Sequence, residues 1–183
     1  MSCKGLRVND QTELKDVFVW SSRFETGLRE VDLQHAKLVQ MINALALIAV
    51  EDTEQPKLLR LLDELQDYAG YHFKTEEDLM AQYALNAEFI DGHVHAHESL
   101  AEQIRIVRKL AETAESNAGV AVGRLLPFLI KWLLFHVLGS DMRMAHEIIA
   151  LHRGETHERA EELALAQQSE SLVIVLDALN DIT

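Results

Sequence analysis

The stretch GHVHAHE, residues 92–98, places a histidine at every second position: His93, His95 and His97. Such alternation fits one face of a strand, a surface histidine tract, or a metal site in which only some of the three histidines take part. The flanking sequence favours a helix, because apolar residues recur three and four positions apart from about Glu88 to Ser116. The stripe of this segment consists of Phe89, His93, His97, Leu100, Ile104, Val107 and Ala111.

Helical geometry separates the three histidines into two directions. Residues four apart lie about 40° apart around the helix axis and one turn along it, so His93 and His97 point to the same side. His95 lies about 200° around the axis from His93 and is expected to face away. The stretch therefore indicates an HxxxH pair with a bystander, and His72 with Glu76 forms a comparable HxxxE pair.

The same periodicity predicts three more long helices. They span about Val31 to Ala49, from near Pro56 to about Tyr83, and about Val122 to Leu151. Each apolar stripe carries histidines or acids at positions where leucine would be expected. Burying several titratable groups together is costly unless a metal compensates them. The short links between helices then predict an all-α, antiparallel four-helix bundle with a metal site in its core.

The candidate ligands come from all four helices. They are His35, His72, Glu76, His93, His97, His136 and Asp141. His136 and Asp141 are five residues apart, which corresponds to about 140° of rotation in a regular helix, so their side chains would point in different directions. We therefore predict a local π-type widening near Gly139 that turns Asp141 toward the core.

Counting bonds predicts an open position at a pair of metal ions. Five histidines supply five bonds and two bridging carboxylates supply four, whereas two octahedral ions need about twelve positions in all. One shared oxo or hydroxo bridge fills two more, which leaves a single position for a small external ligand. Imidazole and carboxylate ligands without thiolate favour iron, with manganese or zinc behind it.

Composition restricts the class of protein. The chain has 183 residues, 48% of them hydrophobic, with eight glycines, two prolines and a formal charge of −13. This is typical of a helical protein and argues against a nucleic-acid or anionic-membrane partner, both of which need a basic surface. The single cysteine, Cys3, allows no intrachain disulfide, and the N-terminus lacks a secretion signal, so we expect a cytoplasmic protein. The longest apolar run, 125–139, is too short to span a bilayer.

Three regions are expected along the chain: an N-terminal arm over 1–17, the bundle over 18–153, and a further helix over 154–183. In the last region Leu165, Leu172 and Leu179 lie seven apart, and Val175 and Ile182 each follow a leucine by three residues, as in a short heptad seam. Such a seam could join a second chain or a downstream domain. The chain ends without a helix-ending glycine, which fits either truncation or ordinary fraying.

Four segments of the sequence resemble the successive motifs of the bacterial hemerythrins. They are FVWSSRFETGLREVDLQHAKLVQMINAL (18–45), HFKTEEDLM (72–80), HVHAH (93–97) and FLIKWLLFHVLGSD (128–141), and the resemblance covers roughly residues 18–150. It implies a non-haem di-iron centre that binds dioxygen at the open position of one iron.

By the same resemblance each candidate ligand acquires a role. One iron would be held by His93, His97 and His136, and the other, with the open position, by His35 and His72. Glu76 and Asp141 would bridge the pair. Family members with C-terminal extensions are often input modules for signalling domains such as diguanylate cyclases.

The remaining polar and aromatic residues are expected to serve structure. We predict outward positions for Glu77, His95, His146, His152 and His157, and packing roles for Trp20 and Trp132.

Three functions are therefore compared. The first is an oxygen or redox sensor that uses the C-terminal helix, the second an oxygen carrier or store, and the third a di-iron oxidase or a scavenger of peroxide or nitric oxide. The enzyme ranks last, because oxygen-activating bundles use Glu-x-x-His pairs and more carboxylates.

Overall fold

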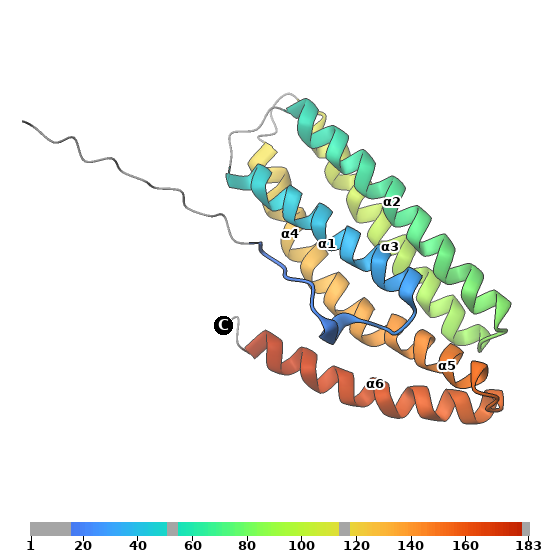
Figure 1. Cartoon of the computed structure of the whole chain (residues 1–183). Helices are drawn as coiled ribbons and strands as arrows, with labels where there is room; N and C mark the ends of the chain where they lie inside the picture. Colours follow the sequence, from blue (N-terminus) through green and yellow to red (C-terminus); the bar gives the residue numbers. More distant parts are fainter. Residues whose placement is uncertain (1–15, 51–54, 114–117, 181–183) are drawn as a thin grey trace, which may run out of the picture.

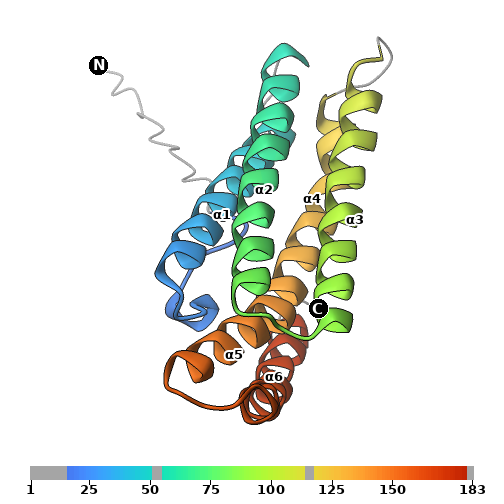
Figure 2. The same ribbon diagram turned by 90° about the vertical axis from the view of Figure 1, so that its right-hand side faces the viewer.

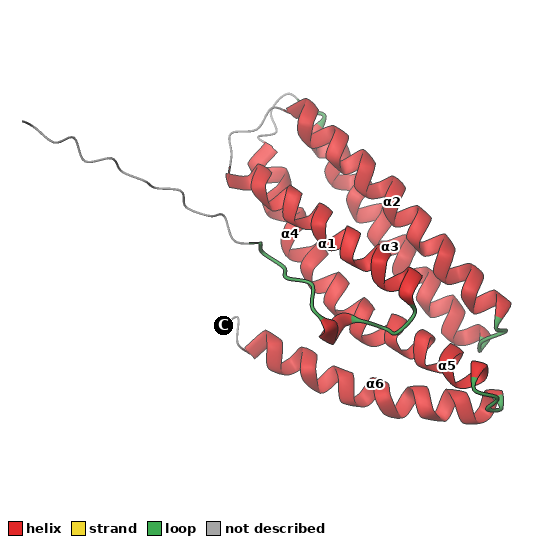
Figure 3. Ribbon diagram, viewed as in Figure 1, coloured by secondary structure: helices red, strands yellow, loops and turns green. Residues whose placement is uncertain are grey.

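Helices make up most of the described chain. The computed structural model describes residues 16–50, 55–113 and 118–180, and within these ranges it contains no strand (Figure 3). The elements are η1 (Ser22–Phe24), α1 (Arg29–Val50), α2 (Gln55–Gln82), α3 (Ala87–Ala111), α4 (Ala118–Phe135), the π-helix η2 (His136–Asp141), α5 (Met142–His152) and α6 (His157–Asn180). The predicted all-α class is confirmed.

The first four long helices form the predicted antiparallel bundle. Consecutive helices run in opposite directions (Figure 1), and α1 contacts α2 and α4 while α3 contacts the same two helices. The apolar faces meet in a core whose fully buried members include Leu45, Leu58, Leu62, Ile104 and Leu125. Burial of such side chains supplies most of the stability of a bundle, and it fixes which face of each helix points inward.

The turn between α2 and α3 fixes where α3 begins. Ala84 adopts a left-handed conformation, with φ 49°, and the amide of Leu85 donates to the carbonyl of Met80. The side chain of Asn86 then caps α3 by accepting hydrogen bonds from the amides of Glu88 and Phe89. These contacts set the rotation of α3 and therefore the direction of the histidines that follow.

Helix α3 ends earlier than predicted, at the last residue of its apolar stripe. The prediction extended to Ser116, whereas the helix ends at Ala111 and residues 114–117 lie outside the described chain. The hydroxyl of Thr113 donates to the carbonyl of Leu110. A side chain that takes a main-chain acceptor in this way competes with helix continuation.

The fourth predicted helix is continuous in direction but changes type. It consists of α4, η2 and α5, and Pro127 lies inside α4. Val122–His152 is the one stretch within the described ranges that is long and apolar enough to cross a membrane, and an 18-residue window within it has a mean hydropathy of 1.5. Core helices of soluble proteins meet the same criterion, and half of this window is buried inside the protein.

Helix α6 folds back after Gly154, whose φ of 90° suits a residue without a side chain. It lies along α5 and η2 rather than extending away from the bundle (Figures 1 and 2). Ala160 and Ala164 are fully buried in α6, and their small size lets the helix lie close to its neighbours. The side chains of the proposed seam at Leu172, Val175, Leu179 and Ile182 lie outside the described part.

The segment before α1 is anchored on the bundle. The amide of Phe18 donates to the side chain of Asn43 at 3.1 Å, and the Asn43 amide group donates back to the carbonyl of Phe18 at 2.8 Å. Trp20 and Phe24 pack against the main core from this segment. These contacts attach the segment from Phe18 onward to the bundle.

Candidate metal centre

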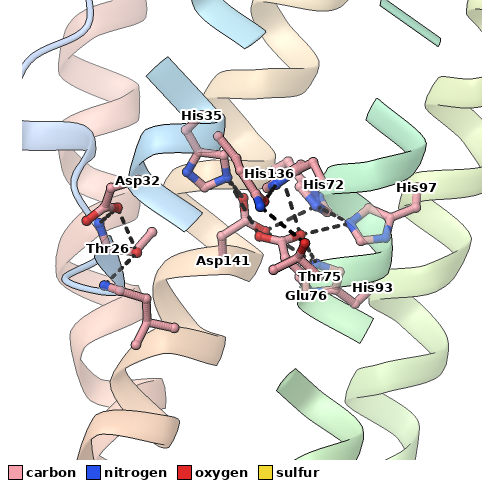
Figure 4. Close-up of polar contacts among 12 residues, drawn as sticks. Thr26, Asp32, His35, His72, Thr75, Glu76, His93, His97, His136 and Asp141 are labelled. Atoms are coloured by element: carbon pink, nitrogen blue, oxygen red, sulfur yellow. Dashed lines mark hydrogen bonds and ion pairs between the residues drawn. The ribbon is translucent and has the colours of Figure 1, made fainter. Parts of the chain in front are cut away.

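All of the predicted ligands converge in the middle of the bundle (Figure 4). Helix α1 carries His35, α2 carries His72 and Glu76, α3 carries His93 and His97, and η2 carries His136 and Asp141. Each of these residues is at most 5% exposed. On α2 and on α3 the two ligands lie four residues apart, so both point to the same side of their helix, as the spacing predicts.

The cluster has two halves that share one carboxylate. In one half, ligand atoms of Glu76, His93, His97 and His136 lie within 4.8 Å of one another. In the other half the same holds for His35, His72, Glu76 and Asp141. The first half therefore has three imidazoles and the second has two, which is the division that the resemblance implies.

Asp141 faces both halves. Its Oδ1 lies 3.1 Å from His136 Nε2 and 3.4 Å from His93 Nε2, whereas its Oδ2 lies 3.1 Å from His35 Nε2. The two oxygens thus point to opposite halves, as a bridging carboxylate requires. Glu76 is similar, because its Oε2 lies 3.1 Å from His97 Nε2 and its Oε1 lies 3.7 Å from His35 Nε2.

The predicted π-helix explains how Asp141 reaches the cluster. Residues His136–Asp141 form a π-helix, and both end residues are buried. Its wider turn carries one more residue per hydrogen-bonded ring than an α-helix does, so a spacing of five no longer rotates Asp141 to the opposite face. The prediction of a local widening near Gly139 is confirmed.

Burial and the contacts between the side chains shift the pKa values of the cluster in different directions. Burial lowers the pKa of His72 to about 3. Burial also tends to lower the pKa of His35, but the carboxylates of Asp141 and Glu76 outweigh it and raise this pKa to about 9. For Asp141, burial and then repulsion from Glu76 raise the pKa. A site that holds some imidazoles neutral and some carboxylates close together is poised to accept cations.

The polar atoms at the centre fit a metal pair. Several are buried without a hydrogen-bond partner in the described chain: Nε2 of His35, Oε1 of Glu76 and both carboxylate oxygens of Asp141. His97 Nε2 and His136 Nε2 lie only 3.0 Å apart, and two imidazole lone pairs face each other stably only around a proton or a cation. Unpartnered buried groups of this kind are costly, and metal ions would satisfy them together.

Two further residues orient the histidines from behind, and the sequence prediction did not identify either role. The Nδ1 of His72 lies 3.0 Å from Oε1 of Gln34, and the Nδ1 of His97 lies 3.1 Å from Oε1 of Glu77. These contacts leave each Nε2 directed at the cluster. The predicted outward position of Glu77 is wrong, because its side chain is only 36% exposed and reaches across to α3. Gln34 is buried on the apolar stripe beside His35, which was a signal available in the sequence.

Aromatic rings enclose the cluster. Phe73 stacks on His97 with ring centroids 3.9 Å apart, and Trp132 stacks on His136 at 4.1 Å. The indole of Trp132 also donates to the carbonyl of Ala96, so this residue fixes a ligand as well as packing. Trp20 lies against His35 at 5.8 Å on the opposite half.

Most of the other histidines lie outside the cluster, as predicted. The side chain of His95 is 85% exposed, His157 is exposed, and the exposed His152 contacts the hydroxyl of Tyr83. His146 differs from the prediction, because it is half-buried and lines a cavity between α5 and α6. Helix α6 covers a face that the sequence pattern of α5 alone indicated as surface.

Comparisons with known proteins agree with this geometry. Residues 26–148 match the family model described as the hemerythrin HHE cation-binding domain. The chain is 26% identical to a bacteriohemerythrin from Stenotrophomonas maltophilia, over 73% of this chain and 83% of that protein. It is 32% identical to a bacteriohemerythrin from Pseudomonas paraeruginosa, over 67% and 76% respectively.

A eukaryotic relative extends the comparison. The hemerythrin-like protein of Naegleria gruberi is 30% identical over 72% of this chain and 94% of its own length. The family model covers the four bundle helices and most of α5, and ends before α6. The chain belongs to the hemerythrin family.

Proposed function

We propose that this chain is an oxygen or redox sensory domain whose seven clustered side chains hold two iron ions. The metal ligands are His35, His72, Glu76, His93, His97, His136 and Asp141. When bound, the iron pair with its oxo or hydroxo bridge would supply reversible binding of dioxygen at one open position. The family and the cluster together support a di-iron oxygen-binding domain.

The observation that carries this proposal is the unequal division of imidazoles. Three histidines serve one half of the cluster and two serve the other, while Asp141 and Glu76 face both halves. The half with His35 and His72 therefore has the place for an external ligand. Trp20 and Phe73 cover the rings of these two histidines, so that a small apolar molecule would enter a site shielded from water.

Helix α6 supports the sensory part. It is additional to the matched family region, and it packs on α5 and η2, the element that carries His136 and Asp141. A helix in this position contacts the metal centre's own backbone. We infer that it conveys the state of the site to an output domain or a second chain, and that the domain has no catalytic activity of its own.

Metal analysis and an optical spectrum of the purified protein, with and without dioxygen, test the binding function. We expect two iron ions per chain and an absorption band that appears with dioxygen and disappears when it is removed. A protein purified without iron that also fails to take up ferrous iron would contradict the proposal.

Removal of residues 155–183 tests the sensory part. We expect the truncated protein to bind dioxygen with altered affinity or autoxidation rate, because α6 packs on η2. If the truncated and full-length chains respond identically to dioxygen, the chain is better described as an oxygen carrier or store. Turnover of an oxidisable substrate, or of peroxide or nitric oxide, at a catalytic rate would instead favour the enzyme.

The cellular setting follows from charge and composition. A formal charge of −13 makes nucleic acid and anionic membranes unfavourable partners. The single cysteine fits a reducing compartment, so we propose a cytoplasmic protein whose small ligand is dioxygen.

A further inference from the structure

A hydrogen bond joins helix α6 to the backbone of the metal centre. The side-chain amide of Gln168 donates to the carbonyl oxygen of Gly139 at 3.2 Å. Gly139 lies inside the π-helix, three residues after His136 and two before Asp141. The acceptor therefore belongs to the short segment that carries two of the proposed ligands.

The π-helix makes this carbonyl available. The amide of Met142, at the end of this turn, contacts the carbonyls of both Gly139 and Val137. Gly139 itself is buried, and a buried acceptor needs a partner. Gln168 supplies a side-chain donor to this carbonyl, so α6 is bonded directly to the irregular turn.

The geometry links this peptide to both halves of the cluster. Asp141 contacts His136 through one oxygen and His35 through the other, each at 3.1 Å. A carboxylate that spans two halves must rotate when their separation changes. Because Asp141 and Gly139 belong to the same turn, a rotation of the Asp141 backbone tilts the Gly139 carbonyl toward or away from Gln168.

The space beside this contact allows α6 to respond. Gln168, Ser140, Arg143, Glu161 and His93 line part of a cavity of about 360 Å³ between the bundle and α6. Nearer the start of α6, the helix is held by an ion pair between Arg143 and Glu161 at 3.0 Å. The ion pair and the buried Ala160 and Ala164 hold the first turns of α6, so the region around Gln168, further along the helix, is the part of α6 that can shift.

We infer that Gln168 is the positioning residue that couples the metal centre to α6. The inference rests on the proposed function, because it needs a site that changes state with oxygen or redox conditions. Coupling is reciprocal: a site that shifts α6 is itself shifted by α6. Gln168 therefore acts on the centre through Gly139 and Asp141 without contacting a metal.

The test compares Gln168→Leu with Gln167→Leu in the full-length, iron-loaded protein. Gln167 is the adjacent residue of the same type and lines a different cavity, beside His146 and Arg153. Hydrogen–deuterium exchange of η2 and α6 is measured in the reduced and the oxidised states. In the wild type and in Gln167→Leu we expect protection of α6 to differ between the states by about five- to 150-fold, the usual range of such couplings. In Gln168→Leu this difference should be lost.

Two results separate the failure of this inference from the failure of the proposed function. If α6 in the wild type shows the same protection in both states, the sensory function itself fails. If the wild type responds and Gln168→Leu responds equally, the assignment of Gln168 is wrong. The midpoint potential of the iron pair gives a second measurement, because reciprocity requires it to shift in Gln168→Leu and to stay near the wild-type value in Gln167→Leu.

Discussion

At the scale of single residues, the direction of a side chain decides its role more than its chemical type does. His93, His95 and His97 lie within five positions of the chain, yet two of them are buried in the cluster and the third is 85% exposed. We expect His95→Ala to retain both iron ions, because this side chain lies outside the cluster, and His97→Ala to lose at least one, because it removes a ligand from its half of the cluster. Iron content and the oxygen-dependent band measure this, and iron loss in His95→Ala would contradict the ligand assignment.

Glu77 provides a second prediction at this scale. Its carboxylate accepts a hydrogen bond from the Nδ1 of His97, which holds the proton on Nδ1 and leaves Nε2 free to bind metal. We expect Glu77→Leu to weaken iron binding in the half with His97 by about 10- to 100-fold, the usual effect of losing such a partner. Asp78→Asn is the control, because Asp78 is 64% exposed and pairs with Lys74 on the same helix. Equal iron affinity in both variants would show that Glu77 has no orienting role.

The sequence was sufficient for the inward-facing ligands but not for the residues behind them. A histidine on an apolar stripe can be recognised from the sequence, because it stands at a position of the helical period where leucine is expected. Glu77 follows Glu76 and, by helical period alone, points about 100° away from it. Its contact depends on how closely α2 and α3 approach, which is a tertiary property that no local pattern contains.

At the scale of elements, the buried Glu147 of α5 shows what the docking of α6 costs. Glu147 is 2% exposed, and its Oε2 has no hydrogen-bond partner in the described chain. Burial, followed by repulsion from Glu161, raises its pKa. A raised pKa means that folding favours the protonated acid, so the contribution of this group to stability is present below its unfolded pKa of about 4.3 and is lost as the pH rises through the folded value.

We therefore expect Glu147→Gln to stabilise the protein near pH 7 by on the order of 1 kcal/mol, the scale of removing an incompletely partnered buried charge. The gain should shrink as the pH falls and vanish below about pH 4, where the wild-type acid is protonated as well. Thermal unfolding of both proteins across this pH range is the measurement. Glu155→Gln, at an exposed position in the turn before α6, should show no such gain. A gain that is independent of pH would exclude the charge as its cause.

Elements were predictable to the extent that their boundaries have local causes. The start of α2 near Pro56 and the widening near Gly139 both follow from residues at those positions. The end of α3 at Ala111 was predicted too late, at Ser116, because polar residues after the last apolar position do not by themselves mark a helix end, whereas the hydrogen bond of the Thr113 hydroxyl is seen only in the structure. The position of α6 along α5 could not be predicted from the sequence pattern either, because its docking depends on the small residues Ala160 and Ala164 and on a turn at Gly154.

At the scale of the whole molecule, the metal centre is part of the core. The ligands come from α1, α2, α3 and η2, so every wall of the bundle contributes to a single polar cluster. Bound ions would link these walls, whereas the metal-free cluster leaves unpartnered polar atoms at the centre. The bundle is therefore expected to depend on its metals for stability as well as for function.

Removal of iron by a chelator tests this expectation. At a ligand concentration about 100 times the dissociation constant, binding stabilises a folded protein by about 2.7 kcal/mol. For a chain of this size, each kcal/mol corresponds to about 2–4 °C in Tm. We expect the metal-free protein to unfold roughly 5–10 °C lower and to recover when ferrous iron is added back. An unchanged Tm would show that the helices pack independently of the centre.

The two tryptophans give this molecule a built-in optical readout of each half of its centre. The ring centroids of Trp20 and His35 lie 5.8 Å apart, and those of Trp132 and His136 lie 4.1 Å apart. Iron close to an indole quenches its emission, so each indole reports mainly on the half beside it. With Trp20→Phe or Trp132→Phe, the remaining fluorescence would reveal the order in which the two positions fill during titration with ferrous iron, without any attached label.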